Sequence, residues 1–464
     1  MQTRTLTQRI STVFVQARPW SAPATCRFSF QAIAVWLILG SFASTTPLGA
    51  SSLVSETPAT FELAGPPQPI IPPDPRVARL GKIPDWSRLD AYQEKLTREE
   101  FVYLLDHCYS RTPEEHNQHI RVVSDRAYIV KQSNHPVGGW YELRFRTSDS
   151  LSLDGPRYWR KPTELRDIHP NSTRPLEGLH VAVDPGHIGG DWVRWDDRHF
   201  SIIKDTIEVR EGEMNLRVAK ILERDLSLLG ARVTLTREEN APVTEERVET
   251  LEDEARSYLL SRRKVPSAGL IASTTKAMFA ISSEIRTRSE ILNTEIQPDI
   301  ALCLHFNASP WGSRPSFRQS NHLHILINGC YSAGEIAEDD TRLEMLLRIL
   351  QRVYYEEVAI SDEIIRSMKS ETRLPAFAYD GSNGMSVNEN GFLWARNLLA
   401  NRVFMCPVIF FEPYCMNHRE IYERVQMGEY PGLREVNGIY RKNIYQEYAD
   451  GVTAGLVRYY RGKR

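Results

Sequence analysis

Short, almost wholly apolar runs alternate with stretches of helical spacing in the second half of the chain. The runs HVAVD (180–184), ALCLHF (301–306) and PVIFFE (407–412) are typical of strands buried on both faces of a sheet. Apolar side chains recur at helical spacing over residues 211–229 and stop at Gly230, a residue type that commonly ends helices. Strands that alternate with helices predict an α/β fold with a mostly parallel, twisted sheet flanked by helices.

The rest of this region continues the alternation. Residues 231–237 and 324–328 predict two more strands, and residues 244–263 and 275–296 predict two helices. A long helical segment separates the last two predicted strands. Its apolar face contains Leu343, Leu346, Leu347, Leu350, Val353 and Tyr354.

A different pattern covers residues 78–170. Thr97 and Glu100 fit a capping box, which predicts the start of a helix. Residues 126–132 and 140–146 alternate apolar and polar positions and are separated by turn-forming residues, so we expect antiparallel strands. We expect this unit to be a small α+β accessory domain that either packs as a scaffold or binds a ligand.

The length of the chain favours two folded units. With 464 residues, it exceeds the size at which one hydrophobic core usually keeps growing. We place the α+β domain at 78–170 and the α/β catalytic domain at 176–464. Residues 51–77 are rich in proline, a composition typical of a semi-rigid extended linker.

The first fifty residues have the pattern of an export signal. Arginines precede the apolar run AIAVWLILG (32–40), which is too short for a membrane span, since a span needs about 20 apolar residues. We therefore expect residues 1–50 to direct export to the periplasm and to be cleaved after Ala43 or Ala50. The alternatives are an uncleaved anchor or a start codon assigned too early.

Charge and cysteine content narrow the choice of partners. The formal net charge of −2 gives no reason to expect nucleic acid, because phosphate binding needs a basic surplus. Cysteines beyond the signal number five and lack the CxxC spacing of a thiolate zinc site, and an odd number leaves at least one unpaired in an oxidising compartment. We interpret them mainly as small buried side chains, with Cys406 and Cys415 as the pair to check for a disulfide.

Four titratable residues stand at the ends of the predicted elements. His187 follows the first apolar run, His305 and Glu412 lie at the ends of the next two, and Glu211 opens the helix between them. Because ligand sites in parallel sheets gather beyond the carboxyl ends of the strands, one site is able to hold all four. Two His and one Glu as ligands, with a further Glu as base, make up a hydrolytic site for one Zn²⁺ ion.

The spacing alone leaves the choice of ligands open. Glu208 and Glu213 lie within three residues of Glu211, and His199 lies in the intervening loop. A catalytic zinc site needs three protein ligands, and a further uncoordinated carboxylate is needed to take the proton of water and pass it to a leaving amine.

Six segments carry a more specific pattern of motifs. They are DPGHIGGD (184–191), EGEMNL (211–216), RSEILN (288–293), PDIALCLHFNA (298–308), VIFFEPY (408–414) and YADGVTAGLVRYYRG (448–462). Their order and register resemble those of the zinc-dependent N-acetylmuramoyl-L-alanine amidases of type 3, which are cell-wall hydrolases. The resemblance covers about 176–462 and nothing before it.

The resemblance implies a role for each residue of the predicted site. His187, Glu211 and His305 would hold one zinc ion, because the register of the second segment favours Glu211 over its neighbours. Glu412 would act as general base and then as acid, and Asn307 would contact the substrate together with the loop at 379–391. The substrate implied is peptidoglycan, at the amide between N-acetylmuramic acid and L-alanine.

The chain also departs from the pattern of these amidases. His187 and Glu211 are 24 positions apart, which is longer than usual, and helical insertions near 244–285 and 332–370 exceed the core pattern. Some relatives carry a helix that occludes the zinc until a partner moves it. We therefore hypothesise that one insertion gates the site and that an activator protein opens it, while the alternative is an inert elaboration.

Two other functions are consistent with the same residues. One is a peptidoglycan-binding protein with a degenerate site, which is disfavoured because all four polar positions hold competent residue types. The other is a zinc peptidase that cuts within the stem peptide. The commonest form of that enzyme is excluded because no HExxH motif is present.

Overall fold

The computed structural model describes residues 76–133, 139–147, 154–169 and 171–464. The predicted export signal, its cleavage sites and nearly all of the proline-rich linker lie outside these ranges. Within them, none of the helices combines the length and the apolarity that a membrane crossing requires. All of the described residues belong to one compact unit.

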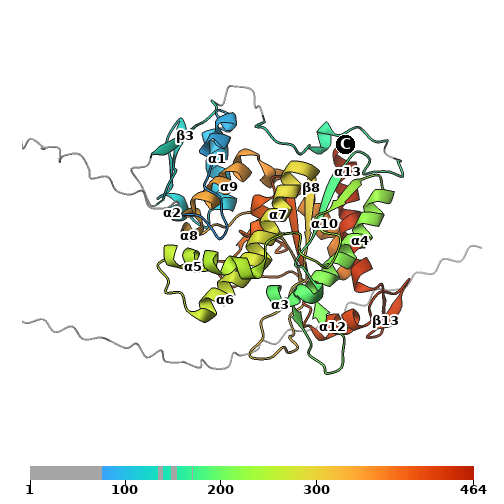
Figure 1. The fold of residues 1–464 in the computed structure, drawn as a ribbon. Coiled ribbons are helices and arrows are strands. Elements are labelled where there is room, and N and C mark those ends of the chain that lie inside the picture. Colours follow the sequence, from blue (N-terminus) through green and yellow to red (C-terminus); the bar gives the residue numbers. More distant parts are fainter. Residues whose placement is uncertain (1–75, 134–138, 148–153, 170) are drawn as a thin grey trace, which may run out of the picture. The chain divides into compact units, whose positions relative to one another are not determined.

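A seven-stranded sheet forms the centre of this unit (Figure 1). In spatial order its strands are β10 (Met385–Ser386), β11 (Leu393–Ala395), β9 (Leu323–Ile327), β12 (Val408–Pro413), β8 (Ile300–Leu304), β4 (His180–Pro185) and β7 (Arg232–Leu235). Strands β12, β8, β4 and β7 run parallel to one another. Strand β9 runs antiparallel to β12, with β11 parallel to β9 and β10 antiparallel at the edge. The predicted α/β fold with a mostly parallel sheet is confirmed.

Helices cover both faces of the sheet, which explains why its central strands are apolar throughout. Along β8, Ile300, Leu302 and Leu304 face one apolar core, while Ala301 and Cys303 face another. The first core is closed by α4 (Glu211–Leu228), α10 (Val353–Thr372) and α13 (Ile444–Lys463). The second is closed by α7 (Glu284–Ile291), η7 (Leu292–Ile296) and α11 (Leu399–Val403).

Two predicted helices have different limits in the structure. The helix predicted over 244–263 is helical only from η5 (Val248–Leu251) and α5 (Glu252–Ser261), because the Glu284 carboxylate accepts hydrogen bonds from the backbone N–H groups of Val243 and Thr244 and holds that segment extended. The next helix begins earlier than predicted. It comprises α6 (Ala268–Ala277), the π-helical η6 (Met278–Ser283), α7 and η7.

The long helical segment after β9 is in fact two helices. Helix α9 (Asp339–Leu350) ends before Arg352, which adopts a left-handed backbone with φ of 56°, and α10 begins at the next residue. The Arg352 guanidinium donates a hydrogen bond to Glu100 at 2.8 Å. An ion pair with a distant part of the chain therefore fixes the junction, and helical periodicity gives no sign of it.

Residues 76–169 contribute helices and a three-stranded antiparallel sheet that pack on the same core. Their elements are η1 (Trp86–Tyr92), α1 (Arg98–Leu104), η2 (Leu105–Tyr109), α2 (Pro113–His116), β1 (Ile120–Val122), β2 (Arg126–Val130), β3 (Trp140–Arg144) and η3 (Pro162–Glu164). The Thr97 hydroxyl accepts a hydrogen bond from the Glu100 N–H and caps α1. The apolar core of this region is continuous with that of α9 and β9. The division of the chain into a separate domain at 78–170 therefore stays a prediction.

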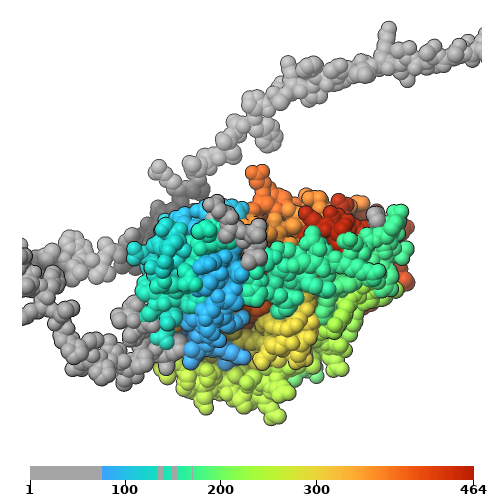
Figure 2. All heavy atoms as spheres, turned by 90° about the horizontal axis from the view of Figure 1, so that it is seen from above, coloured from blue at the N-terminus to red at the C-terminus, as the bar shows by residue number. Residues whose placement is uncertain are grey.

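Figure 2 shows the teal and green residues that follow β3 running across one face of the unit. Tyr158 donates a hydrogen bond to the Asn293 side chain at 3.0 Å, and Arg160 pairs with the buried Asp299 at 2.7 Å. This connecting segment is thus attached to the start of η7 and to the residue that precedes β8.

The cysteines do not form the disulfide considered from the sequence. All five described cysteines are free and buried. Cys406 precedes β12 and Cys415 follows it, and a strand of this length separates its ends by about 20 Å, far beyond disulfide reach.

Candidate metal centre

The turn after β4 presents His187 to the site. The Gly186 N–H donates a hydrogen bond to the carbonyl of Leu304 at 2.9 Å, which extends the pairing between β4 and β8. A Cβ atom on Gly186 would overlap the imidazole of His305, so only glycine fits here. His187 itself has a φ of 60°, a backbone conformation that costs about 1–3 kcal/mol and is held by its surroundings.

Two buried arginines hold this turn. The Arg237 guanidinium donates to the carbonyls of Pro185 at 3.1 Å and of His187 at 2.9 Å. The Arg288 guanidinium donates to the His187 carbonyl at 3.0 Å and pairs with Asp184 at 3.0 Å. Carbonyls of a loop are usually free to move, and these charge-assisted hydrogen bonds fix them.

The long interval between His187 and Glu211 folds back on itself. Its residues form η4 (Gly190–Trp192), α3 (Val193–Asp196) and a short antiparallel pair, β5 (His199–Phe200) with β6 (Val209–Arg210). The N–H of Glu211 donates to the carbonyl of Arg198 at 3.0 Å. The extra residues therefore return the chain to the site, and Glu211 opens α4 directly beside His187.

His187, Glu211 and His305 have the spacing of metal ligands. Their ligand atoms lie within 4.8 Å of one another. Glu211 Oε1 is 3.3 Å from His187 Nε2 and 3.2 Å from His305 Nδ1. Ligand atoms at zinc-ligand distances from one tetrahedral ion are about 3.4 Å apart, so this set fits a single zinc ion.

The second carboxylate oxygen of Glu211 supports the same assignment. Glu211 is 1% exposed, and its Oε2 is buried without a hydrogen-bond partner among the described residues. A buried, unsatisfied carboxylate oxygen is costly, and a bound cation removes that cost. Burial would raise the pKa of Glu211, but the two histidines hold it well below its ordinary value, so the carboxylate is available as an anionic ligand.

Both imidazoles have surroundings that suit metal ligands. Burial lowers the pKa of His187, which favours the neutral ring that binds metals. The His305 ring stacks on Phe410 with centroids 4.2 Å apart and meets the His187 ring edge-on at 4.9 Å.

Glu412 lies beside these three residues without pairing with a cation. It stands in β12 directly opposite His324 of β9, and it lines the same cavity of about 320 Å³ as the three candidate ligands. Burial raises the pKa of Glu412 to about 7. His305 opposes this increase, and the negative charge of Glu211 adds to it. A carboxylate with this pKa suits proton transfer near neutral pH.

The cavity, which we call the site pocket, has helical walls. Its lining residues are Asp184, Gly186, His187, Arg198, Glu211, Ala280, Ile281, Glu284, Ile285, Arg288, His305, Phe306, Asn307, Ala308, His324, Arg396, Leu398, Leu399, Ala400, Phe410 and Glu412. One wall comes from η6 and the start of α7, where Ile281 remains 43% exposed. A second wall comes from α11.

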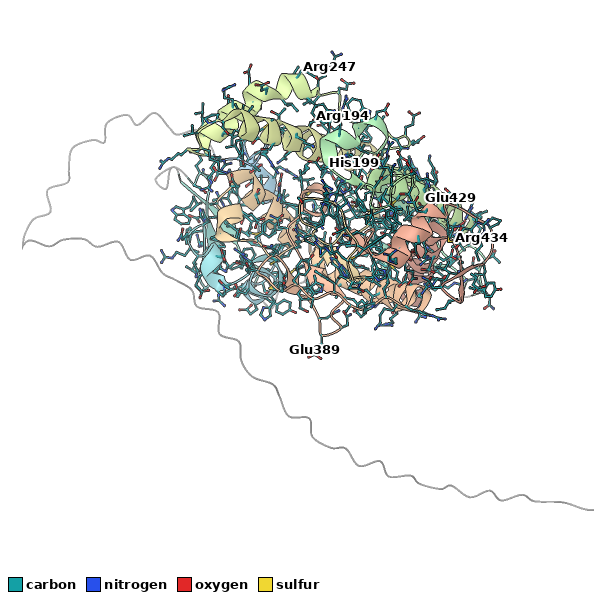
Figure 3. All side chains as sticks on the ribbon, turned by 90° about the horizontal axis from the view of Figure 1, so that it is seen from below. Arg194, His199, Arg247, Glu389, Glu429 and Arg434 are labelled. Atoms are coloured by element: carbon teal, nitrogen blue, oxygen red, sulfur yellow. The ribbon has the colours of Figure 1, made fainter. Side chains whose placement is uncertain are left out.

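The alternative ligands have partners elsewhere. His199 Nδ1 is 2.8 Å from Glu208, and Arg210 pairs with Glu208 at 2.8 Å and with Glu213 at 3.0 Å. Figure 3 shows His199 near the surface, on the same side as Arg194. The structure thus brings Glu211, and none of these three residues, together with the two histidines.

Asn307 and the loop at 379–391 lie differently. Asn307 lines the site pocket, and its N–H donates to the carbonyl of Tyr414 at 2.8 Å. Most of the loop lies away from the pocket: Asn388 donates to Asp362 of α10 at 3.0 Å, and Figure 3 shows Glu389 at a tip that projects outward. Only Tyr379, at the start of the loop, approaches the site, at 3.3 Å from His324 Nε2.

Sequence reasoning missed three residues of the site pocket: Arg198, His324 and Arg396. His324 is at the amino end of β9, and it reaches the site edge only because β9 runs antiparallel to β12. The sequence predicts a strand at this position but not its direction. The arginines are common surface residues, and no spacing distinguishes them from the other arginines of the chain.

No protein-family model matches the chain, and no curated protein does. Several solved structures are similar to it. The CwlD amidase from Clostridioides difficile, solved in complex with the GerS lipoprotein, is 12% identical over 61% of this chain and 98% of its own, with a TM-score of 0.35. The N-acetylmuramyl-L-alanine amidase Ami1 from Mycobacterium smegmatis is 14% identical over 62% and 99%, with a TM-score of 0.35. The amidase AmiC2 of Nostoc punctiforme is 15% identical over 61% and 98%, with a TM-score of 0.31.

Similarity of this size carries no argument about function. The functional assignment therefore depends on the side chains of the site and on the motifs that contain them.

Proposed function

We propose that this protein is an exported zinc-dependent amidase that hydrolyses the amide between N-acetylmuramic acid and the L-alanine of the peptidoglycan stem. The observation that carries the proposal is the cluster of His187, Glu211 and His305, with ligand atoms within 4.8 Å of one another. Beside it lies Glu412, which forms no ion pair with any residue that the structure describes. The resemblance of the surrounding motifs to those of the type 3 amidases supports the choice of substrate.

His187, Glu211 and His305 would hold the zinc ion. When bound, zinc supplies a Lewis acid that polarises an amide carbonyl and acidifies water. Glu412 accepts the proton from the attacking water at a carboxylate oxygen, because its pKa of about 7 leaves a large part of it ionised at neutral pH. It then gives that proton to the leaving nitrogen, so that the peptide departs with a free amine.

Neighbouring side chains also fix the positions of the two proposed histidine ligands. Phe410 stacks on His305 and fixes the imidazole plane, while Arg237 and Arg288 hold the carbonyl of His187. Fixed ligands and a fixed base cost no reorganisation during the reaction.

The decisive test uses the full chain and its Glu412→Gln variant. Each is loaded with zinc and incubated with purified peptidoglycan, and the soluble products are analysed by mass spectrometry. We expect the native protein to release intact stem peptides with a free L-alanine amine. Glu412→Gln keeps the shape of the side chain but removes the base, so product formation should fall by at least about 100-fold while the zinc content stays at one ion per chain.

Other products would point to the other functions. Fragments cleaved inside the stem peptide would indicate a zinc peptidase. Tight binding to peptidoglycan without any product would indicate a binding protein with a degenerate site.

Metal analysis of two neighbouring glutamates tests the ligand set separately. Glu211→Ala should lose zinc because it removes a buried ligand. Glu213→Ala removes an ion pair with Arg210 and a hydrogen bond from the Gly190 N–H at 3.3 Å but no ligand atom, so it should keep the metal. Equal zinc loss in both variants would contradict the assignment of Glu211.

Export and an activator protein belong to the same proposal. The arginines and the apolar run at 32–40 support export to the periplasm. The wall formed by Met278–Ser283, which falls in the insertion near 244–285, supports a gate that an activator protein opens. Fractionation of cells that express the full chain tests the first part, and the effect of an Ile281→Ala substitution in this wall on peptidoglycan hydrolysis tests the second.

A further inference from the structure

Three arginines line the site pocket, and only one of them is neutralised. Arg288 is 2% exposed and pairs with Asp184 and Glu284. Arg198 and Arg396 have no carboxylate oxygen within 4.0 Å of their guanidinium groups among the residues that the structure describes. Arg198 is exposed to solvent, whereas Arg396 is half-buried, so Arg396 is the better placed of the two to bind an anionic group.

The carboxylates of the pocket are not available to these two arginines. Asp184 accepts hydrogen bonds from Arg288 and Thr236, and Glu284 accepts them from Arg288 and from the backbone of Val243 and Thr244. Glu211 is a proposed zinc ligand, and Glu412 is the proposed base. The positive charge of Arg396 is therefore left for a ligand.

Arg396 is held in a defined position beside the proposed base. It follows β11, where its N–H donates to the carbonyl of Ile327 at 3.0 Å. Its guanidinium donates to the Tyr379 hydroxyl at 3.3 Å and lies 5.7 Å from the centre of the Tyr379 ring. The same hydroxyl is 3.3 Å from His324 Nε2.

This chain of contacts directs Arg396 toward the site edge of the sheet. His324 stands directly opposite Glu412 in the antiparallel pair of β9 and β12. Two successive hydrogen bonds, through the Tyr379 hydroxyl, thus connect the Arg396 guanidinium to His324, the strand neighbour of the proposed base. Its remaining N–H groups are free to bind a carboxylate with the paired geometry that guanidinium favours.

The buried ring of His324 gives a second, independent indication of a ligand. His324 is 1% exposed, and its Nδ1 is buried without a hydrogen-bond partner among the described residues. Burial of a polar ring nitrogen without a partner is costly, and such groups are usually satisfied by a ligand or by ordered water.

We infer that Arg396 binds a carboxylate on the peptide side of the substrate, so that the preferred substrates carry a free α-carboxylate on the second residue of the stem. This inference rests on the proposed function. An extended peptide advances about 3.5 Å per residue, so that carboxylate is about 7 Å from the scissile amide. Strand β11 lies two strands, or about 10 Å, from β12, and the side chain of Arg396 extends back across that gap.

Two synthetic substrates test the inference on the zinc-loaded full chain. They are N-acetylmuramoyl tripeptides that differ only in an α-carboxylate or an α-carboxamide on a γ-linked second residue. We expect the native protein to show a KM about 10- to 100-fold lower for the carboxylate, the range expected for one charge-assisted hydrogen-bonded pair. Arg396→Gln should reduce this ratio to below about threefold, and Arg396→Lys should retain part of it, because lysine keeps the charge but not the paired geometry.

Two further arginines serve as comparisons. Arg194→Gln should keep the native ratio, since Arg194 is exposed at the surface in Figure 3 and does not line the pocket. Loss of the ratio in Arg198→Gln but not in Arg396→Gln would overturn the assignment to Arg396.

The remaining outcomes are also decisive. Equal KM values for the two substrates in the native protein, or an unchanged ratio in Arg396→Gln, would refute the carboxylate site while leaving the amidase intact. Hydrolysis of neither substrate, by the native protein or by an Ile281→Ala variant that trims the proposed gate, would overturn the proposed function itself. If Arg396→Gln does not fold, Tyr379→Phe removes the hydroxyl that positions the guanidinium, and it should reduce the ratio severalfold through KM rather than kcat.

Discussion

At the scale of single residues, the site depends on a close approach that only glycine permits. A methyl group on Gly186 would overlap the ring of His305. We expect Gly186→Ala to displace that imidazole and to weaken zinc binding by at least about tenfold, because a ligand shifted by a fraction of an ångström no longer meets the metal with the required geometry. Competition with a fluorescent zinc chelator measures the affinity.

A second glycine provides the control for this variant. Gly269 is exposed in α6, and a Cβ atom there would have no neighbour within 4 Å. Gly269→Ala should therefore bind zinc as tightly as the native protein. Unchanged zinc affinity in Gly186→Ala would mean that the turn after β4 does not support the ligands rigidly.

At the scale of elements, two long helices are joined along a stripe of small residues. Gly451 and Gly455 of α13 face Met368 and Ile364 of α10, and a Cβ on Gly455 would overlap the backbone of Ile364. Alanine is the better helix former by about 1 kcal/mol, but overpacking costs about 1–3 kcal/mol. We expect the packing cost to exceed the gain in helix propensity, so that Gly455→Ala lowers the free energy of unfolding by up to about 2 kcal/mol, as measured by urea denaturation.

At the exposed end of α13, a glycine-to-alanine substitution should not lower the free energy of unfolding. A Cβ atom on Gly462 would have no neighbour within 4 Å, so Gly462→Ala should leave the stability unchanged or raise it by a few tenths of a kcal/mol. A gain in stability from both substitutions would show that α10 and α13 are packed less tightly than these contacts imply.

The sequence predicted elements best where one local pattern determines them. The run at 180–184 is buried on both faces in β4, and apolar spacing marked α4 up to Gly230, whose φ is 101°. It could not predict the direction of β9, because a short apolar run is compatible with either direction. Nor could it predict that Arg352 ends α9, because the Glu100 that binds its guanidinium is distant in sequence.

The candidate site, like the fold, was predictable where a local motif determines it and not where a tertiary contact does. Motif register predicted His187, Glu211, His305 and Glu412 because each lies at or just beyond the end of a strand or opens a helix, and the structure places all four around one pocket. Arg396 was not predictable, since its place in the pocket depends on the pairing of β11 with β9 and on a contact with Tyr379. Residues that act through tertiary contacts leave little local trace in a single sequence.

At the scale of the whole molecule, the accessory region at 78–170 and one face of the large sheet share an apolar core. Leu104 and Tyr109 are wholly buried in the same cluster as Leu346 of α9 and Ile325 of β9. Arg342, which is 0% exposed, adds a polar link, since its guanidinium donates to the Val130 carbonyl of β2 at 2.7 Å and to Asp339 at 2.8 Å. A shared core of this kind predicts cooperative unfolding of the accessory region with the sheet.

Replacement of Arg342 tests that cooperativity. Arg342→Met leaves Asp339 as an unpaired buried charge, so we expect a loss of about 3–5 kcal/mol in the free energy of unfolding. Far-UV circular dichroism and zinc release, followed in the same urea titration, should shift together in one transition, because the two regions share buried apolar side chains. Arg366→Met is the matched control, since Arg366 forms only an exposed pair with Glu363 and should change stability by less than about 0.5 kcal/mol. The contrary result would be two separate transitions, of which Arg342→Met shifts only the one that precedes zinc release. That result would establish 78–170 as an independent domain.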